Sequence, residues 1–206
     1  GFFNEGRAYL FLGSASGLAA SPSWSASGGQ ANARFGAAVA AAGDVNNDGF
    51  DDVIVGAPQH DNGVTDEGRV YLFLGSASGL SATPDAILEV NVATAGFGGS
   101  LSGTGDVDGD GFVDILVGAS GWDNGQNNEG GAFFYRGGAS GLLPGPAWSV
   151  EGDQIDAALG SSVRGAGDVS FDGRPDLLVG ASGYDGDLVN EGRVQLFLGS
   201  PMGPRK

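Results

Sequence analysis

The chain has 206 residues, 41 of them glycine, and a formal net charge of −16 at pH 7. Glycine is roughly three times as frequent as in an average protein, and without a collagen triplet this favours many short strands joined by turns. The negative charge argues against nucleic acids and anionic membrane surfaces as partners. The absence of cysteine excludes disulfides and thiolate metal sites. No apolar run approaches about 18 residues, so no membrane span is predicted.

The sequence repeats with a period of 62 residues. The clearest mark of the repeat is an acidic segment with the pattern Asp-x-(Asn/Asp/Ser)-x-Asp-Gly-x-x-Asp. Its three copies occupy residues 44–52, 106–114 and 168–176. A fixed period of this size predicts a stack of similar modules rather than one irregular core.

Short strands are predicted in the same order in each repeat. A strand of alternating small and apolar residues, such as 37–41, precedes the acidic loop, and a β-branched run such as 53–55 follows it. A third strand recurs at 5–13, 67–75, 129–137 and 191–199. A fourth, outer strand is marked by Pro22 and Trp24 and by Pro146 and Trp148, since proline suits an edge strand.

Four antiparallel strands per repeat, without helical periodicity, predict an all-β fold, a β-propeller built of four-stranded blades. Residues 1–34 would supply strands 3 and 4 of a partial blade. Residues 35–96 and 97–158 would form complete blades, and residues 159–206 a blade without its outer strand. This is a partial ring, since propellers usually close with at least four blades. We expect either an excerpt of a longer propeller or closure by self-association with another chain.

Three features in succession resemble the FG-GAP repeat of integrin α-subunit propellers and their bacterial relatives. They are Phe35-Gly36, the acidic loop at 44–52 and the run Val-Ile-Val-Gly-Ala-Pro at 53–58. The resemblance covers three motifs and nearly the whole chain, with departures at Leu159 and Ser170 in the third copy. It implies an extracellular or cell-surface adhesion or protein-binding module with structural Ca²⁺, about three ions per chain. The alternatives are a carbohydrate-binding, lectin-like propeller and an accessory propeller domain of a larger surface protein or enzyme.

The acidic loops have the spacing of a calcium site. Calcium takes six to eight oxygen ligands, and side chains at i, i+2 and i+4 followed by glycine can converge while the chain turns. The assignment of these positions as ligands matches the family's calcium motif. The predicted side-chain ligands are Asp44, Asn46, Asp48 and Asp52; Asp106, Asp108, Asp110 and Asp114; and Asp168, Ser170, Asp172 and Asp176. The predicted carbonyl donors are Phe50, Phe112 and Arg174.

The loops admit two other interpretations. An EF-hand needs a glutamate at loop position 12, where this chain has Val55, Val117 and Val179 within strands, so that interpretation fails. Metal-free turns are also compatible with Asp and Gly. However, the pattern occurs in three aligned copies, and the carboxylates within each cluster would repel one another without a cation.

A ranking of the three loops follows from ligand charge alone. The second loop offers four aspartates, whereas the first and third replace one of them by Asn46 and Ser170. We therefore expect the second loop to bind calcium most tightly and the third most weakly. A calorimetric titration in which the third loop fills first would contradict this order.

A second candidate site combines a ring with a carboxylate in each repeat. The residues are His60 and Asp61, Trp122 and Asp123, and Tyr184 and Asp185. A planar side chain packed at a blade junction is one interpretation, and a surface for a protein or glycan ligand is the other. With a single histidine at a variable position and no cysteine, no nucleophile and base stand out, so we expect no enzymatic activity.

Overall fold

The computed structural model describes residues 1–206 and contains fifteen strands and no α-helix. The strands form a two-stranded partial blade, two four-stranded blades, a three-stranded blade and a small hairpin, each of them antiparallel. The prediction of an all-β fold with four-stranded antiparallel blades is therefore confirmed. No helix of the structure is long and apolar enough to span a membrane.

The partial blade pairs β1 (Arg7–Leu10) with β4 (Trp24–Ser27). Between them in the chain, β2 (Gly13–Ser14) and β3 (Gly17–Leu18) form the hairpin. The first blade contains β5 (Ala38–Gly43), β6 (Asp52–Ala57), β7 (Arg69–Phe73) and β8 (Ala86–Leu88). The second contains β9 (Ser100–Gly105), β10 (Asp114–Ala119), β11 (Gly131–Tyr135) and β12 (Trp148–Glu151). The third contains β13 (Leu159–Gly167), β14 (Asp176–Ala181) and β15 (Arg193–Phe197).

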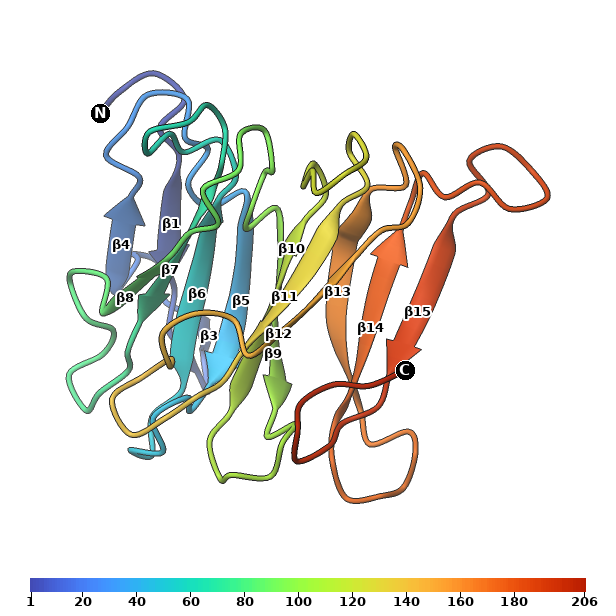
Figure 1. Cartoon of the computed structure of the whole chain (residues 1–206). Coiled ribbons are helices and arrows are strands. Elements are labelled where there is room, and N and C mark those ends of the chain that lie inside the picture. The colour runs from blue at the N-terminus through green and yellow to red at the C-terminus, as the bar shows by residue number, and fades with distance from the viewer.

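The blades lie side by side in chain order, and the array is not closed into a ring (Figure 1). The first strands of successive blades, β5, β9 and β13, contact one another. The first residues of each blade are also hydrogen-bonded to the preceding blade. The Phe97 N–H of the second blade donates to the carbonyl of Glu67 in the first, at 3.0 Å. Phe35 and Leu159 make the same contact with Glu5 and Glu129. The Phe-Gly position of the repeat thus attaches one blade to the next.

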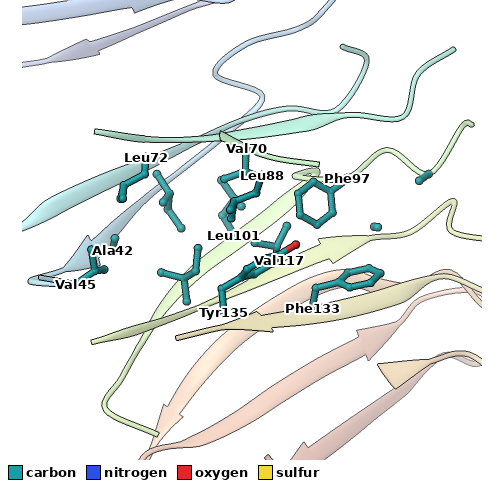
Figure 2. Packing of buried hydrophobic residues seen from close by; sticks show 14 residues of the cluster. Ala42, Val45, Val70, Leu72, Leu88, Phe97, Leu101, Val117, Phe133 and Tyr135 are labelled. Atoms are coloured by element: carbon teal, nitrogen blue, oxygen red, sulfur yellow. The ribbon is translucent and has the colours of Figure 1, made fainter. Parts of the chain in front are cut away.

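The hydrophobic core is divided among the junctions between blades. The largest cluster packs Val70 and Leu72 of the first blade against Leu101, Val117 and Tyr135 of the second (Figure 2). Two further clusters lie between the second and third blades and between the partial and first blades. Since side chains alternate along a strand, each sheet gives one face to each of its neighbours.

The outer strands begin at Trp24, Ala86 and Trp148, so the two tryptophans that mark an outer strand in the sequence do lie in one. Trp24 packs edge-on against Phe73 of the next blade, with ring centroids 4.9 Å apart. Trp148 packs in the same way against Phe197, also at 4.9 Å. The tryptophans therefore stabilise contacts between blades.

Glycine is required where strands of neighbouring blades approach most closely. A Cβ atom on Gly56 would lie 2.0 Å from the carbonyl oxygen of Gly98, and one on Gly118 would lie 2.1 Å from that of Gly160. Gly180 occupies the same position in the third blade, where no further blade packs, and its nearest neighbour would be 3.6 Å away. The need for glycine thus comes from packing between blades.

Both ends of the array leave apolar surface uncovered. At the N-terminal end, a groove of about 320 Å³ lies between β1 and the first blade and is lined by ten hydrophobic residues, including Val39 and Val55. At the C-terminal end, Val194 of β15 is 68% exposed. After β15, Leu198 and Arg205 exchange two backbone hydrogen bonds of 2.7 and 2.9 Å, at the position of the turn that precedes the outer strand in a complete blade, where Leu74 and Arg136 accept the N–H groups of Ser81 and Leu143.

We predict that Gly118→Ala lowers the free energy of unfolding by about 3 kcal/mol, because the methyl group overlaps backbone atoms that cannot move independently. The matched control, Gly180→Ala, should change it by less than about 0.5 kcal/mol. Urea denaturation of both variants measures the difference. Equal effects would contradict the assignment of this glycine to blade packing.

Candidate metal-binding loops

Each acidic loop joins the first strand of a blade to the second. The strand that precedes the loop ends at Gly43, Gly105 or Gly167, which have φ angles of 78, 82 and 69°. These left-handed conformations suit glycine and turn the chain into the loop. The last aspartate of the loop is then the first residue of β6, β10 or β14.

The first aspartate of each loop holds the turn. In the first loop, the Asp44 carboxylate accepts the N–H groups of Asp48 at 3.0 Å and Gly49 at 2.8 Å. Asp106 and Asp168 accept the equivalent pairs at 2.9–3.1 Å. The loop therefore wraps around this carboxylate, as the Asp and Gly positions of the repeat require.

The last aspartate connects the loop to the third strand. Asp114 is fully buried, and its two oxygens accept the Val107 N–H at 2.9 Å and the Gly137 N–H at 3.0 Å. Asp52 and Asp176 make the same two contacts, to Val45 and Gly75 and to Val169 and Gly199. Each carboxylate oxygen of Asp52 and Asp114 retains a further lone pair that could bind a cation, whereas Oδ2 of Asp176 also accepts the Ser170 N–H at 3.0 Å.

The protonation of these buried aspartates differs between loops. Burial raises the pKa of Asp114 to about 7 and raises the pKa of Asp52 above its ordinary value, although the amide donors act in the opposite direction. Burial also acts to raise the pKa of Asp176, but the N–H groups of Gly199, Ser170 and Val169 outweigh it and the pKa is lowered. A nearby divalent cation would favour the ionised form of all three.

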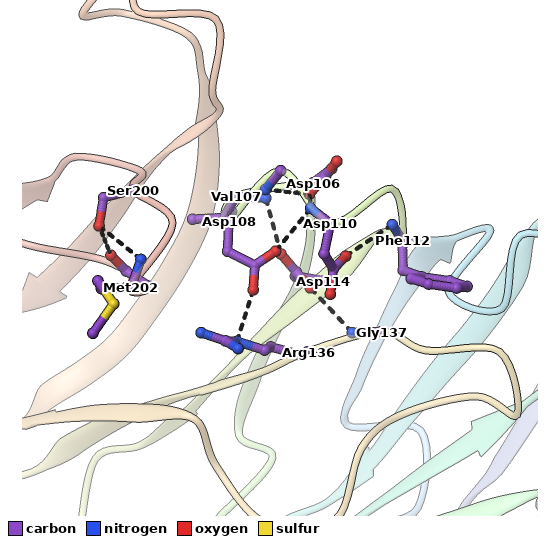
Figure 3. A network of polar contacts seen from close by, with 12 residues as sticks. Asp106, Val107, Asp108, Asp110, Phe112, Asp114, Arg136, Gly137, Ser200 and Met202 are labelled. Carbon is purple, nitrogen blue, oxygen red and sulfur yellow. Dashed lines mark hydrogen bonds and ion pairs between the residues drawn. The ribbon is translucent and has the colours of Figure 1, made fainter.

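The second loop brings more carboxylates close together than the other two loops do. Asp106, Asp108 and Asp114 each place one carboxylate oxygen within 4.8 Å of the others (Figure 3). No other loop of the structure gathers three carboxylates this closely. Carboxylate oxygens at such spacing fit a hard cation such as calcium. The number of ions per chain remains a prediction.

The remaining predicted ligands lie in the same loops. The side-chain amide of Asn46 donates to Asp48 at 2.9 Å, and Asp110 accepts the Phe112 N–H at 3.0 Å. Asp172 accepts the Arg174 N–H at 3.0 Å.

The second loop contacts a positively charged side chain that was not predicted from the sequence. Arg136, which follows β11, forms an ion pair with Asp108, with Nε and Oδ2 2.7 Å apart (Figure 3). The other repeats carry leucine at this position, at Leu12, Leu74 and Leu198. This departure from the repeat was the available signal.

The rings of the second candidate site lie at the opposite edge of the blades, just after β6, β10 and β14. His60 is buried and packs edge-on against Tyr71, and Trp122 packs edge-on against Phe133 at a centroid distance of 5.0 Å. The guanidinium of Arg193 lies over the ring of Tyr184, 4.2 Å from its centroid. These contacts are internal to each blade and favour a packing role for the rings.

The carboxylates beside the rings face their own loops. Asp61 accepts the Asp66 N–H at 2.7 Å, and Asp123 and Asp185 accept the N–H groups of Asn128 and Asn190. In addition, the Gln30 side chain bonds both the N–H and the carbonyl of Asp61 from the preceding repeat, at 2.8 and 2.9 Å. Gln154 holds Asp185 in the same way.

A buried glutamate near this edge has an unusual environment. Glu67 is fully buried, and neither carboxylate oxygen has a hydrogen-bond partner. Burial, and then the nearby charge of Glu89, raise the pKa of Glu67. The equivalent Glu129 instead accepts the Asn124 N–H at 2.7 Å.

Ionisation of Glu67 therefore costs stability. The cost is absent below the ordinary pKa of about 4.5, where the folded and unfolded states are both protonated, and it grows as pH rises toward the raised pKa. We predict that Glu67→Gln stabilises the protein by about 1 kcal/mol at pH 7 and has little effect at pH 4. Thermal unfolding at both pH values measures this, with Glu129→Gln as the control. A Glu67→Gln variant that is less stable than wild type at pH 7 would contradict it.

The fold and the loops define a class: a repeat protein of β-propeller blades with an acidic loop between the first two strands of each blade. The family model described as "FG-GAP repeat" matches residues 35–73, 97–135 and 159–197. The chain belongs to the FG-GAP repeat family, as the sequence analysis predicts.

Curated relatives are integrin α chains. The chain is 38% identical over 176 residues to integrin alpha-5 of Xenopus laevis, covering 81% of this chain and 16% of the relative. It is 41% identical over 183 residues to integrin alpha-IIb of Homo sapiens, covering 82% and 17%. It is 33% identical over 168 residues to integrin alpha-8 of Mus musculus, covering 77% and 15%. The chain thus spans about a sixth of the length of these relatives.

Proposed function

We propose that this chain is a calcium-stabilised, integrin-like binding module that acts in adhesion outside the cell or at its surface. The observation that carries the proposal is the threefold FG-GAP repeat, with an acidic loop in every copy and similarity to integrin α chains. The partner would be a protein that binds to the propeller surface, and the chain would carry out no catalysis. The blade boundaries at residues 34/35, 96/97 and 158/159 belong to the same proposal.

Calcium has a structural role in this proposal. The loop aspartates are already tied to the backbone of the loop and of the third strand, so an ion bound between them would stabilise the folded blade. Binding to the native state alone stabilises a protein by about 2.7 kcal/mol when the ligand is at a hundred times its dissociation constant.

We predict that chelation lowers the thermal midpoint and that Asp48→Asn reduces the stabilisation by calcium, because it removes one ligand charge from the first loop. Asp51→Asn is the matched control, since Asp51 lies in the same loop, is exposed, and is not a predicted ligand. Differential scanning calorimetry with calcium and with chelator measures both. Identical midpoints of the wild type under the two conditions would contradict a structural role for calcium.

The binding role is tested by surface plasmon resonance with the immobilised chain and a panel of purified extracellular matrix proteins. We expect at least one calcium-dependent interaction that chelator abolishes. Absence of binding to every member in calcium would contradict adhesion through this segment.

Glycan binding through the ring and carboxylate pairs is the alternative function. Each ring contacts a side chain of its own blade, but His60 is buried and Arg193 lies over the face of Tyr184, whereas Trp122 meets Phe133 edge-on and is partly exposed, so Trp122 is the ring chosen for the test. A glycan array signal that is lost in Trp122→Ala would favour this alternative over protein binding.

Self-association is the proposal for the two open ends. The groove beside Val39 and the face of β15 around Val194 are both apolar, and burial of such surfaces against a second copy would remove them from water. Native mass spectrometry in calcium distinguishes a dimer, which supports closure between chains, from a monomer, which contradicts it.

A further inference from the structure

The second acidic loop contains a built-in positive charge. Asp108 has a side chain only 3% exposed, and it forms the ion pair with Arg136. A buried carboxylate needs a compensating charge, and Arg136 supplies it from the end of β11. Figure 3 shows the Asp108 carboxylate directed toward Arg136.

A second arginine, Arg174 of the third acidic loop, contacts the second loop. The guanidinium of Arg174 lies on Gly109, with Nη1 2.1 Å from the position that a Cβ atom on Gly109 would occupy. Nη1 is buried and has no hydrogen-bond partner. Between the first and second loops the residues equivalent to Gly109 and Arg174 are Asn47 and Phe112. Glycine therefore occurs at the position where the arginine side chain leaves no room for a Cβ atom.

We propose that Arg136, assisted by Arg174, is a resident counter-ion of the second loop: it stabilises the loop without metal and competes with calcium for the carboxylates. The inference rests on the proposed calcium function and deepens it. It also alters the order of affinities expected from ligand charge, because Arg136 neutralises Asp108, the aspartate that the first and third loops replace by Asn46 and Ser170.

The direction of the effect follows from charge. Arg136 lowers the free energy of the metal-free loop by compensating Asp108, and it repels a divalent cation bound to the same carboxylates. Both effects weaken calcium binding. Replacement of Arg136 by an uncharged residue should therefore destabilise the metal-free protein and increase its affinity for calcium.

The repeats themselves supply the variants. Arg136→Leu and Arg174→Phe introduce the residues found at the equivalent positions Leu74 and Phe112. Arg193→Leu is the control. It removes the same charge from the start of β15, at the edge of the blade opposite to the acidic loops. All are made in an Asp48→Asn/Asp172→Asn background, which weakens the first and third loops, and each is measured by calorimetric calcium titration and by thermal unfolding in chelator.

We expect Arg136→Leu to tighten calcium binding about tenfold and the double arginine variant to tighten it further, while Arg193→Leu changes it little because salt screens a distant charge. In chelator, Arg136→Leu should lower the thermal midpoint by roughly 5 °C relative to Arg193→Leu.

Unchanged or weaker calcium binding by Arg136→Leu would overturn the inference and leave the calcium function intact. The inference would also be supported if Arg136→Leu binds calcium while the Asp48→Asn/Asp172→Asn protein that retains Arg136 binds none. If neither binds calcium, the calcium function of this loop and the competition both fail. A midpoint in chelator equal to that of Arg193→Leu would overturn the counter-ion role itself.

Discussion

No blade of this protein can bury both of its faces by itself, and the rest of the structure depends on this constraint. Successive residues of a strand point to opposite faces, so Val70 packs toward the second blade while Tyr71 packs toward the partial blade. The core is consequently divided among blade junctions. Close approach across a junction requires glycine, as at Gly118, and the Phe-Gly position holds successive blades in register.

The acidic loops are part of this same framework. The buried aspartate at the end of each loop accepts one N–H from the loop and one from the end of the third strand, as Asp114 does from Val107 and Gly137. A cation bound at the loop would therefore act on the carboxylates that hold three strands of a blade together. This explains how a metal site can stabilise a fold that has small separate cores and no disulfides.

The repeated architecture makes every departure from the repeat informative. Arg136 replaces a leucine, and Arg174 replaces a phenylalanine, and both side chains lie at the second loop. Neither change alters the strands or the turn, because the backbone pattern of the three loops is the same. The loops are thus similar in shape but differ in charge, a property on which calcium affinity depends in the proposed sites.

The sequence by itself determined the 62-residue period, the order of strands, the outer strands at Trp24 and Trp148 and the position of the acidic loops, because alternation and turn residues are local signals. It also predicted the ligand set from spacing. Only the tertiary structure decided that Asp108 is paired with Arg136 and that the Asp61 and Asp185 carboxylates face their own loops. Asp108 and Arg136 meet because β10 and β11 pair as a hairpin, and the Asp61 and Asp185 carboxylates turn inward because of the folded shape of their loops; residue spacing alone specifies neither side-chain contact.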